Sequence, residues 1–191
     1  QHDELVSWLK ETDAERLEAL WRQADELRES HVGGEIHLRG LVEFSNYCSN
    51  RCTYCGLRAS NADVPRYRMT DEEILTCAKN AVILGFGTLV MQSGRDATMD
   101  VDWLTGIIRR IKAETDLAVT LSVGEWPREA YAAWRDAGAD RFLLRFETSN
   151  RKLYNRIHLP VGDRTDRLEI LRELGELGYE VGSGVMIGIP G

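Results

Sequence analysis

Three cysteines stand close together near residue 50, at Cys48, Cys52 and Cys55, in the pattern C-x3-C-x2-C. Three thiolates are one fewer than a closed structural metal site uses, so a metal centre held here keeps one coordination position open. A cluster of four irons and four sulfurs, bound through three of its irons, fits this number of ligands. The spacing therefore predicts a 4Fe-4S cluster whose fourth iron is free for chemistry.

Two other interpretations of these cysteines are weaker. A zinc ion needs a fourth ligand, and the nearest histidine outside the loop, His37, lies a strand-length away. A disulfide would leave one thiol unused. The only other cysteine, Cys77, lies among apolar residues at helical spacing, which is typical of a small core residue.

The pattern C-x3-C-x-aromatic-C, with Tyr54 at the aromatic position, resembles the signature of the radical S-adenosylmethionine (SAM) superfamily. Within that superfamily the chain is similar to HydE-type maturases of iron-iron hydrogenase, in the branch that includes biotin synthase and methylornithine synthase. The resemblance runs from about residue 35 to residue 191. It is carried by the cysteine loop and by residues 43–46, 55–58, 67–70 and 120–127.

The resemblance implies both cofactors and a reaction. In the superfamily the open iron chelates SAM, and an electron passed to the cluster cleaves SAM into methionine and a 5'-deoxyadenosyl radical. The HydE likeness implies a small iron carbonyl-cyanide-cysteine substrate on the route to the hydrogenase active-site cluster. It also implies a reductant of ferredoxin or flavodoxin type, with other hydrogenase maturases as further partners. Two alternatives stay open: a biotin synthase or methylornithine synthase type of enzyme, and a noncatalytic, cluster-carrying fragment.

The resemblance also assigns site residues. Positions expected to contact the amino acid and ribose parts of SAM are matched by Gln92, Ser122, Arg145, Glu147 and Arg167, and the inner substrate pocket is matched by Thr120 and Ser122. Many members of the superfamily have Gly-Gly-Glu after the second strand, whereas residues 92–95 read Gln-Ser-Gly-Arg. This departure favours the HydE and biotin synthase side of the superfamily.

Strand-like and helix-like segments alternate after residue 34. Strands are predicted at 36–45, 88–92, 117–123, 141–146 and 181–189, and helices at 70–85, 102–115, 127–138 and 166–177. Such alternation predicts parallel strands with crossover helices, the repeating unit of a TIM-type β/α barrel. Five units are three short of a full barrel, so we expect an N-terminal part of a longer protein. The expected domains are an N-terminal helical segment, 1–34, and the barrel part, 35–191.

The faces of the predicted strands indicate where a site lies. Phe142, Leu144 and Phe146 share one side of their strand, while Arg145 and Glu147 share the other. Barrel enzymes carry their active sites at the carboxyl ends of the strands, where the cysteine loop also begins. The polar faces are therefore expected to line a cavity next to the cysteines. The alternative is that Arg145 and Glu147 only pair with each other at the end of a strand.

Length and composition limit the remaining choices. The chain has 191 residues, enough for one domain with a sizeable core. Its net charge of -7 argues against a nucleic-acid partner, and no apolar run is long enough for a membrane span. The N-terminus lacks the form of a signal peptide, and thiolates that bind iron suit a reducing compartment. A cytoplasmic protein without a membrane partner is expected.

Overall fold

The computed structural model describes residues 2–159 and 166–189. The chain divides into two compact units, residues 1–37 and residues 38–191. The smaller unit contains the helices α1 (His2–Leu9) and α2 (Ala14–Val32), and neither helix buries a side chain. Asp13 caps α2 by accepting a hydrogen bond from the backbone N–H of Arg16, and Gly33 ends it with a φ of 78°.

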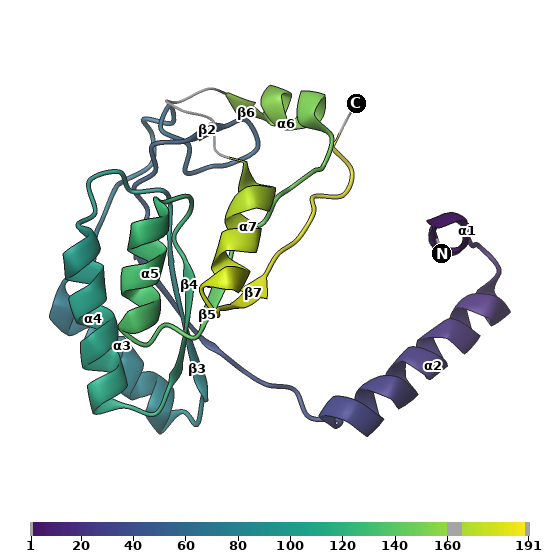
Figure 1. Cartoon of the computed structure of the whole chain (residues 1–191), viewed down its shortest axis with the longest axis horizontal. Helices are drawn as coiled ribbons and strands as arrows, with labels where there is room; N and C mark the ends of the chain where they lie inside the picture. The colour runs from purple at the N-terminus through teal and green to yellow at the C-terminus, as the bar shows by residue number, and fades with distance from the viewer. Residues whose placement is uncertain (1, 160–165, 190–191) are drawn as a thin grey trace. The chain divides into compact units, whose positions relative to one another are not determined.

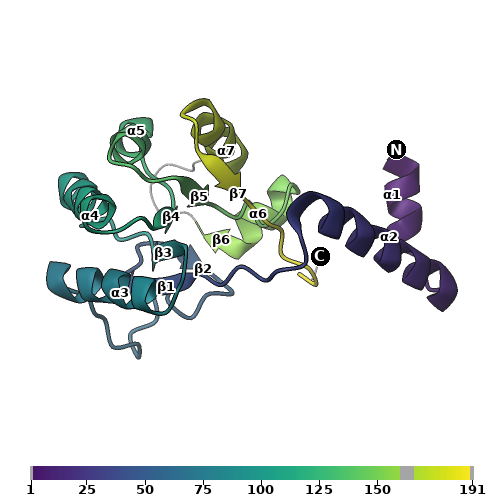
Figure 2. The same ribbon diagram turned by 90° about the horizontal axis from the view of Figure 1, so that it is seen from below.

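The larger unit is built on five parallel strands. They are β1 (Gly40–Ser45), β3 (Thr88–Ser93), β4 (Ala118–Ser122), β5 (Arg141–Leu143) and β7 (Glu180–Gly182), in the order β1-β3-β4-β5-β7. The crossover helices are α3 (Asp71–Ile83), α4 (Val101–Glu114), α5 (Arg128–Asp136) and α7 (Arg167–Glu176). These helices follow the outside of a curved sheet (Figures 1 and 2). The predicted α/β class with parallel strands is confirmed.

Some predicted strands are too long. The predicted strands 36–45, 141–146 and 181–189 are shortened to β1, β5 and β7. The regular pairing between the last two strands ends at Leu143 and Gly182; beyond it, Glu147, which has a left-handed φ of 64°, is joined to Val185 only by an isolated bridge. Gly188, with a φ of 81°, also leaves the extended conformation.

The helix starts follow the capping residues. Thr70 begins α3 with a complete capping box, in which its hydroxyl and the side chain of Glu73 exchange hydrogen bonds with each other's backbone N–H. Asp100 caps α4 and Asp166 caps α7, each by accepting one backbone N–H hydrogen bond through a side-chain oxygen. Pro127 lies at the N-cap of α5, so the helix itself begins one residue after the start of the predicted range 127–138. None of the helices described is both long and apolar enough to cross a membrane.

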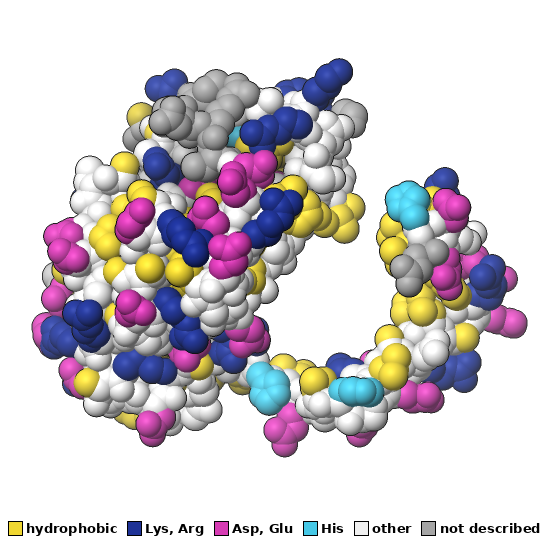
Figure 3. Space-filling view, viewed as in Figure 1, with side chains coloured by type: hydrophobic (Ala, Val, Ile, Leu, Met, Phe, Trp, Pro, Cys, Tyr) yellow, Lys and Arg dark blue, Asp and Glu magenta, His cyan; other side chains and the backbone are white. Residues whose placement is uncertain are grey.

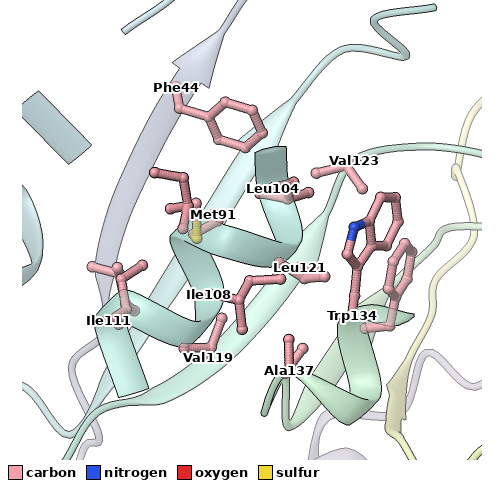
Figure 4. Packing of buried hydrophobic residues seen from close by; sticks show 14 of the residues in the cluster. Phe44, Met91, Leu104, Ile108, Ile111, Val119, Leu121, Val123, Trp134 and Ala137 are labelled. Atoms are coloured by element: carbon pink, nitrogen blue, oxygen red, sulfur yellow. The ribbon is translucent and has the colours of Figure 1, made fainter. Parts of the chain in front are cut away.

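The core lies between the sheet and its outer helices. In β4 and the residue that follows it, Val119, Leu121 and Val123 are fully buried (Figure 4), against helix residues such as Ile108 and Trp134. The other side of β4 carries small or polar residues, such as Thr120 and Ser122. This confirms the predicted alternation, in which one face of the strand packs on helices and the other faces the inside of the curved sheet.

A second, two-stranded sheet was not predicted. It pairs β2 (Arg51–Cys52), inside the cysteine loop, with β6 (His158–Leu159), which follows the short helix α6 (Arg151–Ile157). Cys52 is aligned with His158, and the backbone N–H of Thr53 donates to the carbonyl of Ile157 over 2.8 Å. The cysteine loop is therefore attached to the connection between β5 and α7.

Candidate active site

A cavity of about 400 Å³ opens at the carboxyl ends of the strands. Eight of the predicted site residues line it: Cys48, Cys52, Cys55, Gln92, Ser122, Arg145, Glu147 and Arg167. The structure thus brings the cysteine loop and the polar strand ends around one space. All four cysteines of the chain are free thiols, so the disulfide alternative is wrong.

The three cysteines are arranged differently from the ligands of one metal ion. Thiolates around a single zinc lie about 4 Å apart, because each zinc–sulfur bond is about 2.3 Å. Among the residues described, no three Cys, His, Asp or Glu side chains are grouped in this manner. Cluster ligands bind different irons and need not converge on one point. Burial raises the pKa of the Cys52 thiol to about 11, so iron binding there releases a proton.

The start of the cysteine loop lies against the segment that follows β3. A Cβ atom on Gly94 would stand 2.7 Å from the Cβ of Cys48 and closer still to the carbonyl oxygen of Tyr47, so only glycine fits. The backbone N–H of Ser49 donates to the carbonyl of Arg95 over 2.8 Å, and the Arg95 guanidinium donates to the Ser49 hydroxyl over 3.1 Å. These contacts fix the position of Cys48.

Arg66 organises the chain on both sides of the cysteines. Its guanidinium donates to four backbone carbonyls, those of Asn46 (2.6 Å), Leu57 (3.0 Å), Arg58 (3.0 Å) and Asn61 (3.3 Å). A planar guanidinium with five N–H donors is suited to this role, because a loop without regular structure leaves its carbonyls unpaired. One side chain therefore determines the path of residues 46–61.

A buried carboxylate anchors the base of the loop. Asp96 is 3% exposed and accepts two bonds from the guanidinium of Arg68 (2.6 and 2.9 Å) and one from the hydroxyl of Ser45 (3.1 Å). Arg68 also lies 3.8 Å over the ring of Tyr47, next to Cys48. Burial alone would raise the pKa of Asp96, but the bonds from Arg68 and Thr98 outweigh it and lower the pKa to about 2.

Arg167 and Glu125 form a buried ion pair at the cavity wall. Two nitrogens of Arg167 donate to Oε1 of Glu125 over 2.6 and 2.7 Å, and a third nitrogen donates to the carbonyl of Arg145 over 2.8 Å. Asn50, from the cysteine loop, donates to the other oxygen of Glu125 over 3.2 Å. Burial would raise the pKa of Glu125, but the charge and hydrogen bonds of Arg167 hold it below its usual value.

Glu147 is the other buried carboxylate of the cavity. Its Oε1 accepts from the Tyr54 hydroxyl (3.2 Å) and lies 3.4 Å from Arg145 and 3.8 Å from Arg167. Its Oε2 is buried and has no hydrogen-bond partner among the residues that the structure describes. A left-handed backbone at a non-glycine residue costs about 1–3 kcal/mol. A strained residue with a free carboxylate oxygen is typical of a ligand contact, so Arg145 and Glu147 do more than pair with each other.

The strand register places the remaining predicted residues. Gln92 lies level with Ser122 on β4 and with Glu43 on β1, to which it donates over 3.3 Å. Thr120 lies two residues before Ser122 on the same side of β4, but it does not line the cavity. Its hydroxyl is buried and meets no hydrogen-bond partner in the described part of the chain. Thr120 thus belongs to a layer below the cavity floor.

Sequence reasoning missed several residues that the fold brings to the site. Glu125 contributed only to the resemblance. An acidic residue that directly follows Gly124 at the end of a predicted strand could have been recognised as a site residue. Asn50 stands between two cysteines, where only the tertiary contact with Glu125 reveals its role. His158 carries no sequence signal, yet its Nε2 lies 3.0 Å from the Tyr54 hydroxyl.

Comparisons with known proteins agree with this geometry. The family model of the radical SAM superfamily matches residues 42–191. The [FeFe] hydrogenase maturase subunit HydE of Thermotoga maritima is 50% identical over 174 residues, which are 91% of this chain and 49% of that protein. The 3-methylornithine synthase of Methanosarcina acetivorans is 28% identical over 98% of this chain and 53% of that protein. The chain thus spans about half the length of the curated relatives it matches.

Solved structures give the same result for the fold. A crystal structure of methylornithine synthase (PylB) has a TM-score of 0.89 and 28% identity, covering 99% of this chain and 56% of that one. The maturase HydG from Carboxydothermus hydrogenoformans has a TM-score of 0.82 and 25% identity, covering 94% of this chain and 43% of that one. With its three cysteines on the cavity and a family match over most of its length, the chain belongs to the radical SAM superfamily.

Proposed function

We propose that the protein is a radical SAM enzyme that acts in assembly of the iron-iron hydrogenase active-site cluster. The observation that carries the proposal is one cavity lined by Cys48, Cys52 and Cys55 and by a buried carboxylate, Glu147, with a free oxygen. When bound, a 4Fe-4S cluster and SAM supply reductive cleavage of a carbon–sulfur bond, which gives methionine and a 5'-deoxyadenosyl radical.

The residues of the chain suit these two groups. Cys48, Cys52 and Cys55 provide three thiolates on one wall of the cavity. SAM has an ammonium group, a carboxylate and ribose hydroxyls, which need acceptors and donors in a buried site. The free oxygen of Glu147 supplies an acceptor, and the half-exposed guanidinium of Arg145 has donors left for a carboxylate.

Arg167 has a different role from Arg145 in this proposal. Its guanidinium is almost completely buried and is already held by Glu125 and by a backbone carbonyl. It therefore keeps a fixed positive charge at the cavity wall, near Glu147, whatever the state of the site. Gln92 and Ser122 add neutral polar groups at the same level of the sheet. Such preorganised groups orient a ligand without rearrangement.

The substrate remains part of the proposal. The 50% identity to a protein described as a hydrogenase maturase supports a small iron carbonyl-cyanide-cysteine complex, since the other relatives named above are 28% identical or less. Ser122, which lines the cavity, is proposed to contact that substrate, whereas Thr120 lies one layer deeper on the same strand. We further propose that the substrate is a small molecule, that a one-electron reductant reduces the cluster, and that the protein works in the reducing environment of the cytoplasm.

Anaerobic reconstitution of the full-length protein tests this function. Iron, sulfide, dithionite and SAM are expected to yield 5'-deoxyadenosine, and the Cys52→Ser variant is expected to yield none. The Cys77→Ser variant is the control, because Cys77 packs against the core away from the cavity. If the wild-type protein binds a cluster but makes no 5'-deoxyadenosine, the enzyme proposal is wrong and a noncatalytic cluster carrier remains.

A second measurement tests the substrate. Addition of the protein to a maturation mixture that lacks HydE is expected to restore hydrogenase activity. Formation of 5'-deoxyadenosine without such restoration would support an enzyme of the biotin synthase or methylornithine synthase type instead.

A further inference from the structure

Basic residues are concentrated around the outside of the cysteine loop. They come from two segments that β2–β6 pairing joins, residues 48–66 and 150–159. The basic residues are Arg51, Arg58, Arg66, Arg151, Lys152 and Arg156, and the only acidic residue of the two segments is Asp63. Arg58 and Arg66 are half-buried and donate to carbonyls of the loop, so we call the four exposed residues, Arg51, Arg151, Lys152 and Arg156, the basic face. The two segments together have a net charge of +5, in a chain whose total charge is -7.

These charges are largely uncompensated. Among the residues described, Arg51, Lys152 and Arg156 form no salt bridge, and Arg151 has only a distant one, 3.9 Å, to Asp166. Half of the ten exposed arginines described elsewhere have closer partners, such as Arg128 with Glu176 at 3.0 Å. Figure 3 shows Lys and Arg side chains at the place where α6 lies in Figure 1. An anionic partner is therefore attracted to this part of the protein.

The basic face is directly connected to the cluster ligands. Cys52 is paired with His158 through the backbone, one residue after the end of α6. A chain of aromatic rings follows the same route: Tyr154 of α6 stacks on His158 with 4.0 Å between centroids, and His158 meets Tyr54 edge-on at 5.6 Å. Tyr54 lies between Cys52 and Cys55 and is 38% exposed. A partner bound to α6 would thus be separated from the cavity by a continuous packed layer.

We propose that the basic face is the docking site of an acidic electron-carrier protein that reduces the cluster. This inference rests on the proposed function, which requires one electron for each SAM cleaved. The donor's reduced flavin or iron–sulfur centre loses one electron, and the cluster behind Tyr54 gains it. The small size of the patch and the overall charge of -7 favour a compact acidic protein over a long polyanion such as RNA.

A charge-reversal pair tests the docking site. Lys152→Glu with Arg156→Glu changes the net charge by -4 at two exposed positions of α6 that touch neither the cysteines nor the cavity wall. The control is Arg109→Glu with Arg172→Glu, which makes the same charge change on α4 and α7. Full-length proteins with matched iron content are compared. Two readouts are used: binding of oxidised flavodoxin to immobilised protein, and 5'-deoxyadenosine formation driven by reduced flavodoxin or by dithionite.

The expected result is specific to the protein donor. At low salt the α6 pair is expected to weaken flavodoxin binding and to raise the flavodoxin KM at least about tenfold, and this difference should shrink as salt is added. The dithionite reaction and the control pair should match the wild type. The docking site is overturned if the α6 double variant binds flavodoxin as tightly as the wild type does. It is also overturned if the control double variant loses as much flavodoxin affinity as the α6 variant.

Other outcomes separate this inference from the proposed function. Equal loss with dithionite and flavodoxin means that the α6 charges act on the cluster itself, which also overturns the docking site. Tighter binding of RNA or anionic vesicles than of flavodoxin assigns the face to another partner. Absence of the wild-type dithionite reaction refutes the proposed function, while the binding readout still decides whether α6 recognises an acidic protein.

Discussion

The ion pair between Glu125 and Arg167 gives the sharpest prediction for stability. Glu125→Gln keeps the shape of the side chain and an acceptor for Asn50, but removes the charge that faces Arg167. Arg167 then retains only the carbonyl of Arg145 and, at 3.8 Å, Glu147. Loss of one partner from a buried pair typically costs about 3–5 kcal/mol. Because glutamine preserves part of the hydrogen bonding, we expect about 3 kcal/mol.

The measurement is the free energy of unfolding from denaturant titration of the full-length protein without SAM. The matched control is Glu176→Gln. That carboxylate makes a 3.0 Å pair with Arg128 on the surface, where both side chains are substantially exposed. Removal of such an exposed partner should cost less than about 1 kcal/mol.

Acid pH should erase the difference between the wild type and Glu125→Gln. The pKa of Glu125 is lowered in the folded protein from an ordinary value of 4.5. The stabilisation from its charge is therefore complete well above pH 4.5 and is lost as the pH falls through the lower, folded-state pKa. If Glu125→Gln costs no more than Glu176→Gln at neutral pH, the buried pair contributes nothing and the argument is refuted.

Three further predictions concern the cysteine loop and the cavity. Asp96→Asn should lose about 1–2 kcal/mol at pH 7, but progressively less below pH 4 as the wild-type carboxylate becomes protonated near its pKa of about 2; unfolding at several pH values checks this. Gly94→Ala should lower iron content after reconstitution several-fold, because its methyl group collides with Cys48, while the circular dichroism spectrum is retained. Thr120→Val should leave stability unchanged or raise it by up to about 1 kcal/mol, since it removes a buried hydroxyl that has no partner among the residues described; denaturant unfolding measures this.

Sequence reasoning was most successful where the signal is local. The three cysteines and the alternation of strands with helices each depend on spacing within short stretches of the chain. These features predicted the α/β class, the parallel strands and the candidate cluster ligands. The same local signals overestimated β5 and β7, whose regular pairing ends at Leu143 and Gly182 because the alternating pattern of the sequence continues beyond the backbone pairing.

The sequence by itself determined which groups are available: three thiolates, the polar faces of the strands and the order of elements that places them at one end of a sheet. Only the tertiary structure decided how they are held. Glu125 lies 42 residues from Arg167 in the sequence, and Cys52 is paired with His158, which follows β5 in the chain. Partners so distant in the chain meet only when the sheet curves and the connections pack. Burial, ion pairing and the resulting pKa values are therefore properties of the fold and cannot be found by spacing alone.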